Sequence, residues 1–184
     1  MAFIAVYDAC VLYPNTTRDL LVRVGLAGLV QAKWTNQILD EAFTNLRRNR
    51  PDIAEDKLAR TRHLMNAAVA DCLVTGYEPL IEGLKLPDPD DRHVLAAAIK
   101  AGAQVIVTAN LKDFPPSDLD QWDIEAKSPD QFIFDLIGID DRIIYTCIND
   151  IANARRNPPQ TIDDVLTELE RAGLVETVAA LRLR

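Results

Sequence analysis

The sequence lacks a long hydrophobic run. No stretch of its 184 residues approaches the roughly 18 uninterrupted apolar residues of a membrane-spanning helix. This excludes a protein anchored by such helices. The apolar N-terminus is too short for a signal peptide and meets a carboxylate at Asp8, so we do not expect secretion.

Cysteine and histidine are also scarce. The three cysteines, Cys10, Cys72 and Cys147, are odd in number and widely spaced, which argues against a disulfide framework or a zinc site. We expect reduced thiols in a cytoplasmic protein. Neither histidine, His63 or His93, has a cysteine or carboxylate at the spacing of metal ligands, so both are interpreted as non-catalytic.

Positive charge is in deficit. There are 20 Lys and Arg residues against 28 Asp and Glu residues, which gives a net charge of -8. A protein that coats nucleic acid by neutralising phosphates is usually basic, so that class is disfavoured. The deficit leaves open an enzyme whose acidic cluster holds cations. Hydrophobic residues at 48% and charged residues at 26% are typical of a globular protein of one domain, with a short appendage at most.

The pattern of apolar residues predicts strands that alternate with helices. Continuous apolar runs at residues 3–7 and 104–107 are typical of buried strands, and a parallel sheet covered on both faces is therefore expected. Shorter strands are expected at 32–35, 72–75 and 123–126, and helices at 16–30, 36–48, 51–70 and 92–101. Pro51 is expected to lie in a first turn, and Gly102 to end the last of these helices.

The C-terminal third contains only helical patterns. Thr161 and Asp164 predict a capping box that begins one of these helices. We expect a domain of residues 1–135 and a helical extension of residues 136–184 that packs on the core or on a partner.

Acidic residues follow the expected strands. Asp8 comes directly after the first strand, and residues 108–113 follow the strand at 104–107. Ligands of open parallel sheets bind beyond the carboxyl ends of the strands. Asp88, Asp90 and Asp91 open the preceding helix, where acids also complement the helix dipole without any further role. Asp8 is harder to explain structurally, because a carboxylate at the end of a buried strand is costly unless it is paired or bound to a cation.

As an ordered set, these segments resemble the PIN-domain family of metal-dependent ribonucleases and, within it, the VapC-like toxins. The resemblance covers about residues 1–135. It rests on the segments Phe3–Asp8, Thr35–Glu41, Leu86–Ala98 and Val105–Pro115. It implies a three-layer α/β/α fold around a central parallel sheet, and acidic side chains gathered around one or two divalent cations.

The resemblance assigns roles to individual residues. It implies that Asp8, Glu41, Asp91 and Asp113 are catalytic, and that Asp8, Asp91 and Asp113 bind the metal. The supporting residues would be Asp88, Thr108 and Asn110. Asn110 and Asp113 compete for the fourth acidic position, and Asp88 is an alternative to Asp91. Cys10 departs from the family, because close relatives tend to have Asn there.

Phosphodiester hydrolysis gives this set a chemical reason. Mg²⁺ or Mn²⁺ can supply a nucleophilic hydroxide and stabilise the phosphate near neutral pH, and both ions prefer oxygen ligands. Arg18, Arg92 and Lys112 lie beside the expected acids in sequence and are candidates for contacts with phosphate. Each could equally be a surface charge that balances the acids.

The first hypothesis is therefore a Mg²⁺-dependent endoribonuclease, the toxin of a type II toxin–antitoxin pair. The resemblance implies an RNA substrate, a cognate antitoxin and a homodimer. The alternative is a catalytically degenerate PIN-like domain that binds RNA or protein, which Asn110 and Cys10 motivate. A third hypothesis, phosphotransfer through Asp8, is disfavoured because Cys10 stands where a second Asp would be needed.

Overall fold

A single parallel sheet lies at the centre of the protein. The computed structural model describes residues 3–183. Its strands are β1 (Ile4–Tyr7), β2 (Gln31–Lys33), β3 (Val105–Val107) and β4 (Glu125–Lys127). They are arranged in the order β2-β1-β3-β4, and all three pairings are parallel. The carboxyl ends of β1 and β3 are neighbours, since Tyr7 pairs with Val107.

The two central strands are the most apolar ones. Every residue of β3 and all but the first of β1 are buried, whereas β2 and β4 carry exposed residues at the edges of the sheet. The expected continuous runs are therefore confirmed as the centre of the sheet. Residues 123–126 were expected to form an edge strand, and β4 occupies that edge.

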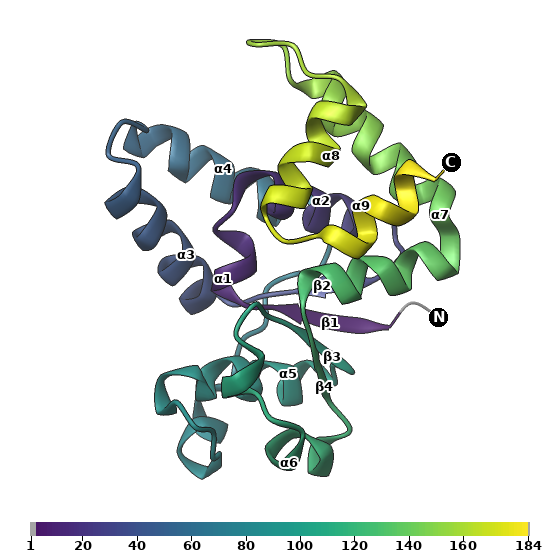
Figure 1. The fold of residues 1–184 in the computed structure, drawn as a ribbon. Coiled ribbons are helices and arrows are strands. Elements are labelled where there is room, and N and C mark those ends of the chain that lie inside the picture. The colour runs from purple at the N-terminus through teal and green to yellow at the C-terminus, as the bar shows by residue number, and fades with distance from the viewer. Residues whose placement is uncertain (1–2, 184) are drawn as a thin grey trace.

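Helices cover both faces of the sheet. They are α1 (Ala9–Leu12), α2 (Asn15–Leu26), α3 (Asn36–Asn49), α4 (Glu55–Ala68), α5 (Arg92–Ala101), α6 (Pro116–Leu119), α7 (Pro129–Ala154), α8 (Ile162–Arg171) and α9 (Val175–Arg182). Short 3-10 turns are η1 (Glu78–Gly83), η2 (Pro89–Asp91), η3 (Leu111–Asp113) and η4 (Asp120–Trp122). Figure 1 shows α5 and α6 on one side of the sheet, with α2 and the C-terminal helices on the other. This is the expected three-layer α/β/α architecture.

Two glycines serve the packing of these layers. Gly102 adopts a left-handed conformation with φ of 64° and ends α5, as expected. Gly25 lets α2 approach β2 closely, because a Cβ atom there would lie 2.9 Å from the Cβ of Ala32.

The C-terminal helices form one layer on the core. α7 packs against α2, α8 and α9, and the expected capping box of Thr161 and Asp164 begins α8. Residue Asp140 interrupts α7 with non-helical dihedral angles, and its carboxylate accepts hydrogen bonds from the backbone of Arg142 and Ile143. The two limbs of α7 meet at an angle (Figure 1). The boundary expected between residues 135 and 136 falls inside the first limb and stays a prediction.

Two local expectations were wrong, and one short helix was missed. Pro51 lies in a turn, and α4 begins at Glu55 rather than at Pro51. Residues 72–75 form only a bridge, in which the backbone N–H of Val74 donates to Trp34 at 2.9 Å. The short helix α1 was not anticipated, because four residues carry too little periodicity to be recognised. Among residues 3–183, no helix is both long and apolar enough to cross a membrane.

Candidate active site

Asp8 is held at the end of β1 by hydrogen bonds to both carboxylate oxygens. It is only 6% exposed. One oxygen accepts from the backbone N–H of Ala9 at 2.7 Å, which caps α1, and the other accepts from the hydroxyl of Thr108 at 2.8 Å. These donors satisfy both oxygens of the buried side chain and fix its direction.

Thr108 and Cys10 connect the ends of β1 and β3. Thr108 is fully buried, and its hydroxyl also accepts from the backbone N–H of Asn110 at 3.0 Å. The Cys10 thiol lies 3.3 Å from the Asp8 carboxylate and accepts from the N–H of Ala109 at 3.3 Å. Cys10 is partly exposed, yet loss of solvation and the charge of Asp8 raise the pKa of its thiol to about 11. The thiol therefore donates to Asp8 rather than competing with it as an anion.

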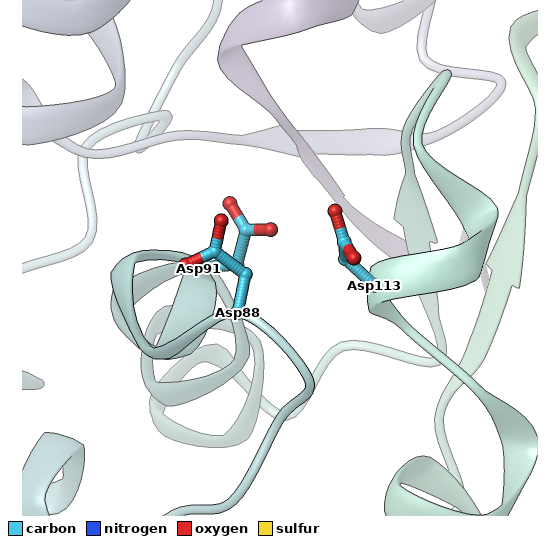
Figure 2. A group of neighbouring side chains, drawn as sticks. All are labelled: Asp88, Asp91 and Asp113. Carbon is cyan, nitrogen blue, oxygen red and sulfur yellow. The ribbon is translucent and has the colours of Figure 1, made fainter.

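Three further acids gather opposite Asp8. Ligand oxygens of Asp88, Asp91 and Asp113 lie within 4.8 Å of one another. Asp88 caps η2 and Asp91 ends it, directly before α5, and Asp113 ends η3 after β3. Figure 2 shows Asp88 and Asp91 side by side with Asp113 facing them from the other segment. Segments far apart in the sequence thus meet at the carboxyl edge of the sheet.

Asn110 and Asp113, the two candidates for the fourth acidic position, lie in contact. The Asn110 side-chain amide donates to the carboxylate of Asp113. Asp113 supplies the charge within the acidic trio, and Asn110 holds one of its oxygens. This arrangement supports the interpretation of Asn110 as a supporting residue.

Asp91 experiences the repulsion of its neighbours. Desolvation, followed by the charges of Asp8, Asp88 and Asp113, raises its pKa to about 6. Crowded carboxylates in a partly desolvated site favour either a proton or a cation. The electrostatics therefore match a site that gains stability when a cation binds.

Glu41 reaches the same region from α3. Its Oε1 lies 2.8 Å from Nε2 of His93, a residue of α5 that is only 3% exposed. The contact is close but poorly aligned, because neither ring nitrogen meets the angular criterion for a hydrogen bond. Two lone pairs would repel at 2.8 Å, so the N–H belongs on Nε2. His93 thus fixes one carboxylate oxygen of Glu41, a contact that sequence spacing could not reveal.

A cleft of about 530 Å³ joins these groups. Asp8, Glu41, Asp91 and Asn110 line it, so the structure brings together the predicted residues from every segment. The remaining lining residues are Ala9, Cys10, Tyr13, Asn45, Asn49 and Asp90. Asp113 lies beside this lining, because its ligand oxygen is within 4.8 Å of those of Asp88 and Asp91.

Arg18, Arg92 and Lys112, the basic residues expected to bind substrate, differ in exposure and in hydrogen-bond partners. Arg18 is buried and donates to the backbone carbonyls of Leu12 and Tyr13 at 3.0 and 3.2 Å, so it fastens α1 to α2 instead of facing the acids. Arg92 donates to the carbonyl of Pro89 at 3.0 Å. Lys112 is exposed on η3, beside Asp113 in the chain.

The donor set fits a hard divalent cation. Asp88, Asp91 and Asp113 offer carboxylate oxygens within reach of one ion, and Asp8 raises the negative potential beside them. The Cys10 thiol is engaged with Asp8 and Ala109, so it is not offered as a soft ligand. Mg²⁺ or Mn²⁺ therefore suits this group better than zinc does.

Comparisons with known proteins agree with this geometry. A PIN domain model matches residues 5–112, and a model of the VapC50 C-terminal domain matches residues 129–183. The first match contains Asp8, Glu41 and Asp91 and ends just before Asp113.

One curated relative comes from Mycobacterium tuberculosis and bears the name "Putative ribonuclease VapC50". It is 38% identical over 94 residues, which are 51% of this chain and 55% of the relative. The match thus spans about half the length of that protein. No solved structure matches the chain significantly. Because the PIN domain model alone covers more than half of the sequence, the chain belongs to the PIN-domain family.

Proposed function

We propose that this protein is an endoribonuclease that depends on Mg²⁺ or Mn²⁺. One observation carries the proposal: carboxylates that follow β1, begin α5, project from α3 and end η3 converge at one edge of the sheet. There, desolvation and the charges of Asp8, Asp88 and Asp113 raise the pKa of Asp91, and the charge of His93 opposes them. Structural acids are normally paired with donors, so such crowding is typical of a functional site.

Each residue has a part in this function. As the resemblance implies, Asp8, Asp91 and Asp113 would hold the cation. Asp88 would be a further ligand, because its oxygen lies within 4.8 Å of those of Asp91 and Asp113, and Glu41 would lie beside them. When bound, the cation would activate water and offset charge on the phosphate. Thr108 and Cys10 orient Asp8, Asn110 orients Asp113, and His93 orients Glu41.

A role as a toxin extends the proposal. The relative that is named a ribonuclease carries the VapC designation, and the C-terminal helices match the VapC50 C-terminal domain. We extend the proposal to a cytoplasmic toxin that cleaves RNA as a homodimer and is neutralised by a cognate antitoxin. The helices α7–α9 would then support dimer or partner contacts.

The test is cleavage of RNA by the purified protein, freed of any partner, with Mg²⁺ or Mn²⁺. Asp8→Asn should lower the rate by more than about 100-fold, because changing even an outer partner of a metal ligand costs 10–100-fold. Asp56→Asn, an exposed acid in the first turn of α4, is the matched control and should leave the rate unchanged.

Calorimetric titration with Mn²⁺ separates an enzyme from a degenerate domain. The parent protein should bind Mn²⁺ and Asp8→Asn should bind it more weakly. Absence of cleavage together with absence of ion uptake would favour the degenerate binding module instead.

A further inference from the structure

The cleft has an acidic half and a neutral half. Its lining includes four acids, Asp8, Glu41, Asp90 and Asp91, and three uncharged polar side chains, Tyr13, Asn45 and Asn49, which we call the neutral half. The hydrolysis proposed above uses only the acids. At about 530 Å³ the cleft is large enough for a small ligand, so the neutral half has room for a part of the substrate beyond the reacting phosphate.

The side chains of the neutral half are aligned by α3. Glu41, Asn45 and Asn49 follow one another at intervals of four residues, which places them in one row along the helix. All of them line the cleft. The row therefore leads from the acidic centre directly to the two amides.

Tyr13 is fixed at the end of this row. Its backbone N–H donates to Ala9 at 3.0 Å, so it closes the short helix that Asp8 caps. Its hydroxyl accepts from the amide of Asn49 at 3.1 Å. The ring is thus tied to Asp8 through α1 and to α3 through Asn49, while the side chain still lines the cleft.

Asn45 is the free hydrogen-bonding group of the neutral half. It is exposed, and among the described residues its amide has no protein partner. An amide offers a donor and an acceptor side by side, which is the pattern that Asn uses to contact the edge of a nucleobase.

The chemistry of the two halves selects the ligand. A second phosphate would be repelled by the adjoining carboxylates, whereas an uncharged base would not. Bases of unpaired RNA stack on aromatic rings and hydrogen-bond to side chains along their edges. We infer that the Tyr13–Asn45–Asn49 subsite binds one unpaired nucleobase of the RNA, next to the phosphate that is cleaved. This inference rests on the proposed nuclease function.

The subsite has two consequences for the substrate. The base must be unstacked from a helix to reach Tyr13, so single-stranded segments and loops are the substrates. The amide of Asn45 contacts the edge of the base, so cleavage depends on base identity at one flanking position.

Binding can be measured apart from cleavage. The background is the full-length Asp8→Asn protein, which should hold RNA without cutting it. Fluorescence anisotropy with single-stranded A, C and U hexanucleotides gives the affinity for each base. Adding Tyr13→Ala should weaken binding about tenfold, as expected for the loss of one base–aromatic stacking contact. Tyr13→Phe keeps the ring and should retain most of the affinity.

Matched controls lie on α7. Tyr145→Ala removes an exposed tyrosine outside the cleft and should change binding less than twofold. Asn45→Ala should reduce the difference in affinity between bases, whereas Asn153→Ala, an exposed asparagine of α7, should not. Equal affinities for Tyr13→Ala and Tyr145→Ala would overturn the subsite, as would a failure of the Asp8→Asn protein to bind any hexanucleotide.

The two proposals fail in different ways. If the parent protein cleaves RNA but Tyr13→Ala binds and cleaves with unchanged base preference, only the subsite is overturned. If the parent protein cleaves no RNA while Tyr13→Ala still weakens hexanucleotide binding about tenfold, the nuclease function fails and the base-binding subsite stands.

Discussion

The C-terminal layer and the edge of the sheet use the same kind of residue in opposite ways. In the C-terminal layer, Asp130 accepts from the backbone N–H groups of Glu176 and Thr177 at 3.0 and 2.8 Å. At the edge of the sheet, Asp91 has two other carboxylates, Asp88 and Asp113, as its near neighbours. Asp130 is thus surrounded by donors, whereas Asp91 is surrounded by other acids.

The pKa values follow this difference. Hydrogen bonds from Thr161 lower the pKa of Asp164, and a hydrogen bond from Thr16 lowers that of Glu168. Desolvation and neighbouring charges raise the pKa of Asp91 to about 6. An acid at the start of a helix is therefore no sign of function by itself, and what surrounds its oxygens decides between a structural and a catalytic role.

The largest expected effect on stability comes from removing an acid whose oxygens accept hydrogen bonds. Asp130→Ala leaves two backbone N–H groups at the start of α9 without their acceptor, and α9 has no cap from its own N-terminal residue. We expect a loss of about 2–3 kcal/mol in the free energy of unfolding, since hydrogen bonds to charged groups contribute about 1.5–3 kcal/mol. Urea denaturation measures this loss, and Mn²⁺ affinity should not change.

Asp163→Ala provides the control in the same layer. Asp163 is exposed and lies 3.5 Å from Arg182, so its removal should cost less than about 0.5 kcal/mol. A similar loss for both variants would mean that the acids of this layer do not act through specific hydrogen bonds.

The next test concerns the contact of Glu41 with His93. His93→Leu removes the group 2.8 Å from Glu41 and should lower Mn²⁺ affinity about tenfold in calorimetry, the lower bound for an outer partner of a metal site. His93→Gln, which restores an N–H donor at a similar position, should recover most of the affinity. Equal losses in both variants would show that His93 acts through packing alone, and the edge of the sheet would then contain no positioned Glu41.

The smallest expected effect is the change in stability with pH that the raised pKa of Asp91 causes in metal-free protein. The folded-state pKa of Asp91, about 6, is above its ordinary value of 3.8, so the folded state binds this proton more tightly. The stability that protonated Asp91 contributes is complete below about pH 4 and is lost as pH rises through about 6.

Asp91→Asn cannot ionise and should escape that loss. In EDTA we expect it to be more stable than the parent protein by about 1 kcal/mol at about pH 8. This is less than the ~3 kcal/mol that the pKa difference implies, because water screens a partly exposed carboxylate. At about pH 4 the difference should vanish. A variant that is less stable than the parent protein at every pH would show that Asp91 supports the fold.

Local sequence patterns predicted the elements whose cause is local. The apolar runs of β1 and β3, the end of α5 at Gly102 and the capping box at Thr161 each depend on a few adjacent residues, and the structure confirms all of them. Pro51 misled because proline is favoured in turns as well as in first helical turns. Residues 72–75 pair with Trp34 only through a bridge, and no local signal sets the length of such a pairing.

The candidate site was predictable in its acids but not in their partners. Asp8, Asp91 and Asp113 stand out because strand ends and helix starts place them at one edge of the sheet. The roles of Arg18 and His93 depend on contacts across elements, with the carbonyl of Leu12 and with Glu41. Such contacts form only when α1, α3 and α5 pack, so sequence spacing carries no record of them.

The interruption of α7 at Asp140 determines how the C-terminal helices are arranged. An unbroken helix of 26 residues would be a rod of about 39 Å at 1.5 Å per residue. Such a rod would be about as long as a compact protein of this size is wide. The bend instead folds the rod back, so that α8 and α9 rest between its limbs (Figure 1). At Asp140 the helix restarts in a new direction, so α7 forms two limbs at an angle and the last two helices pack against both α7 and each other.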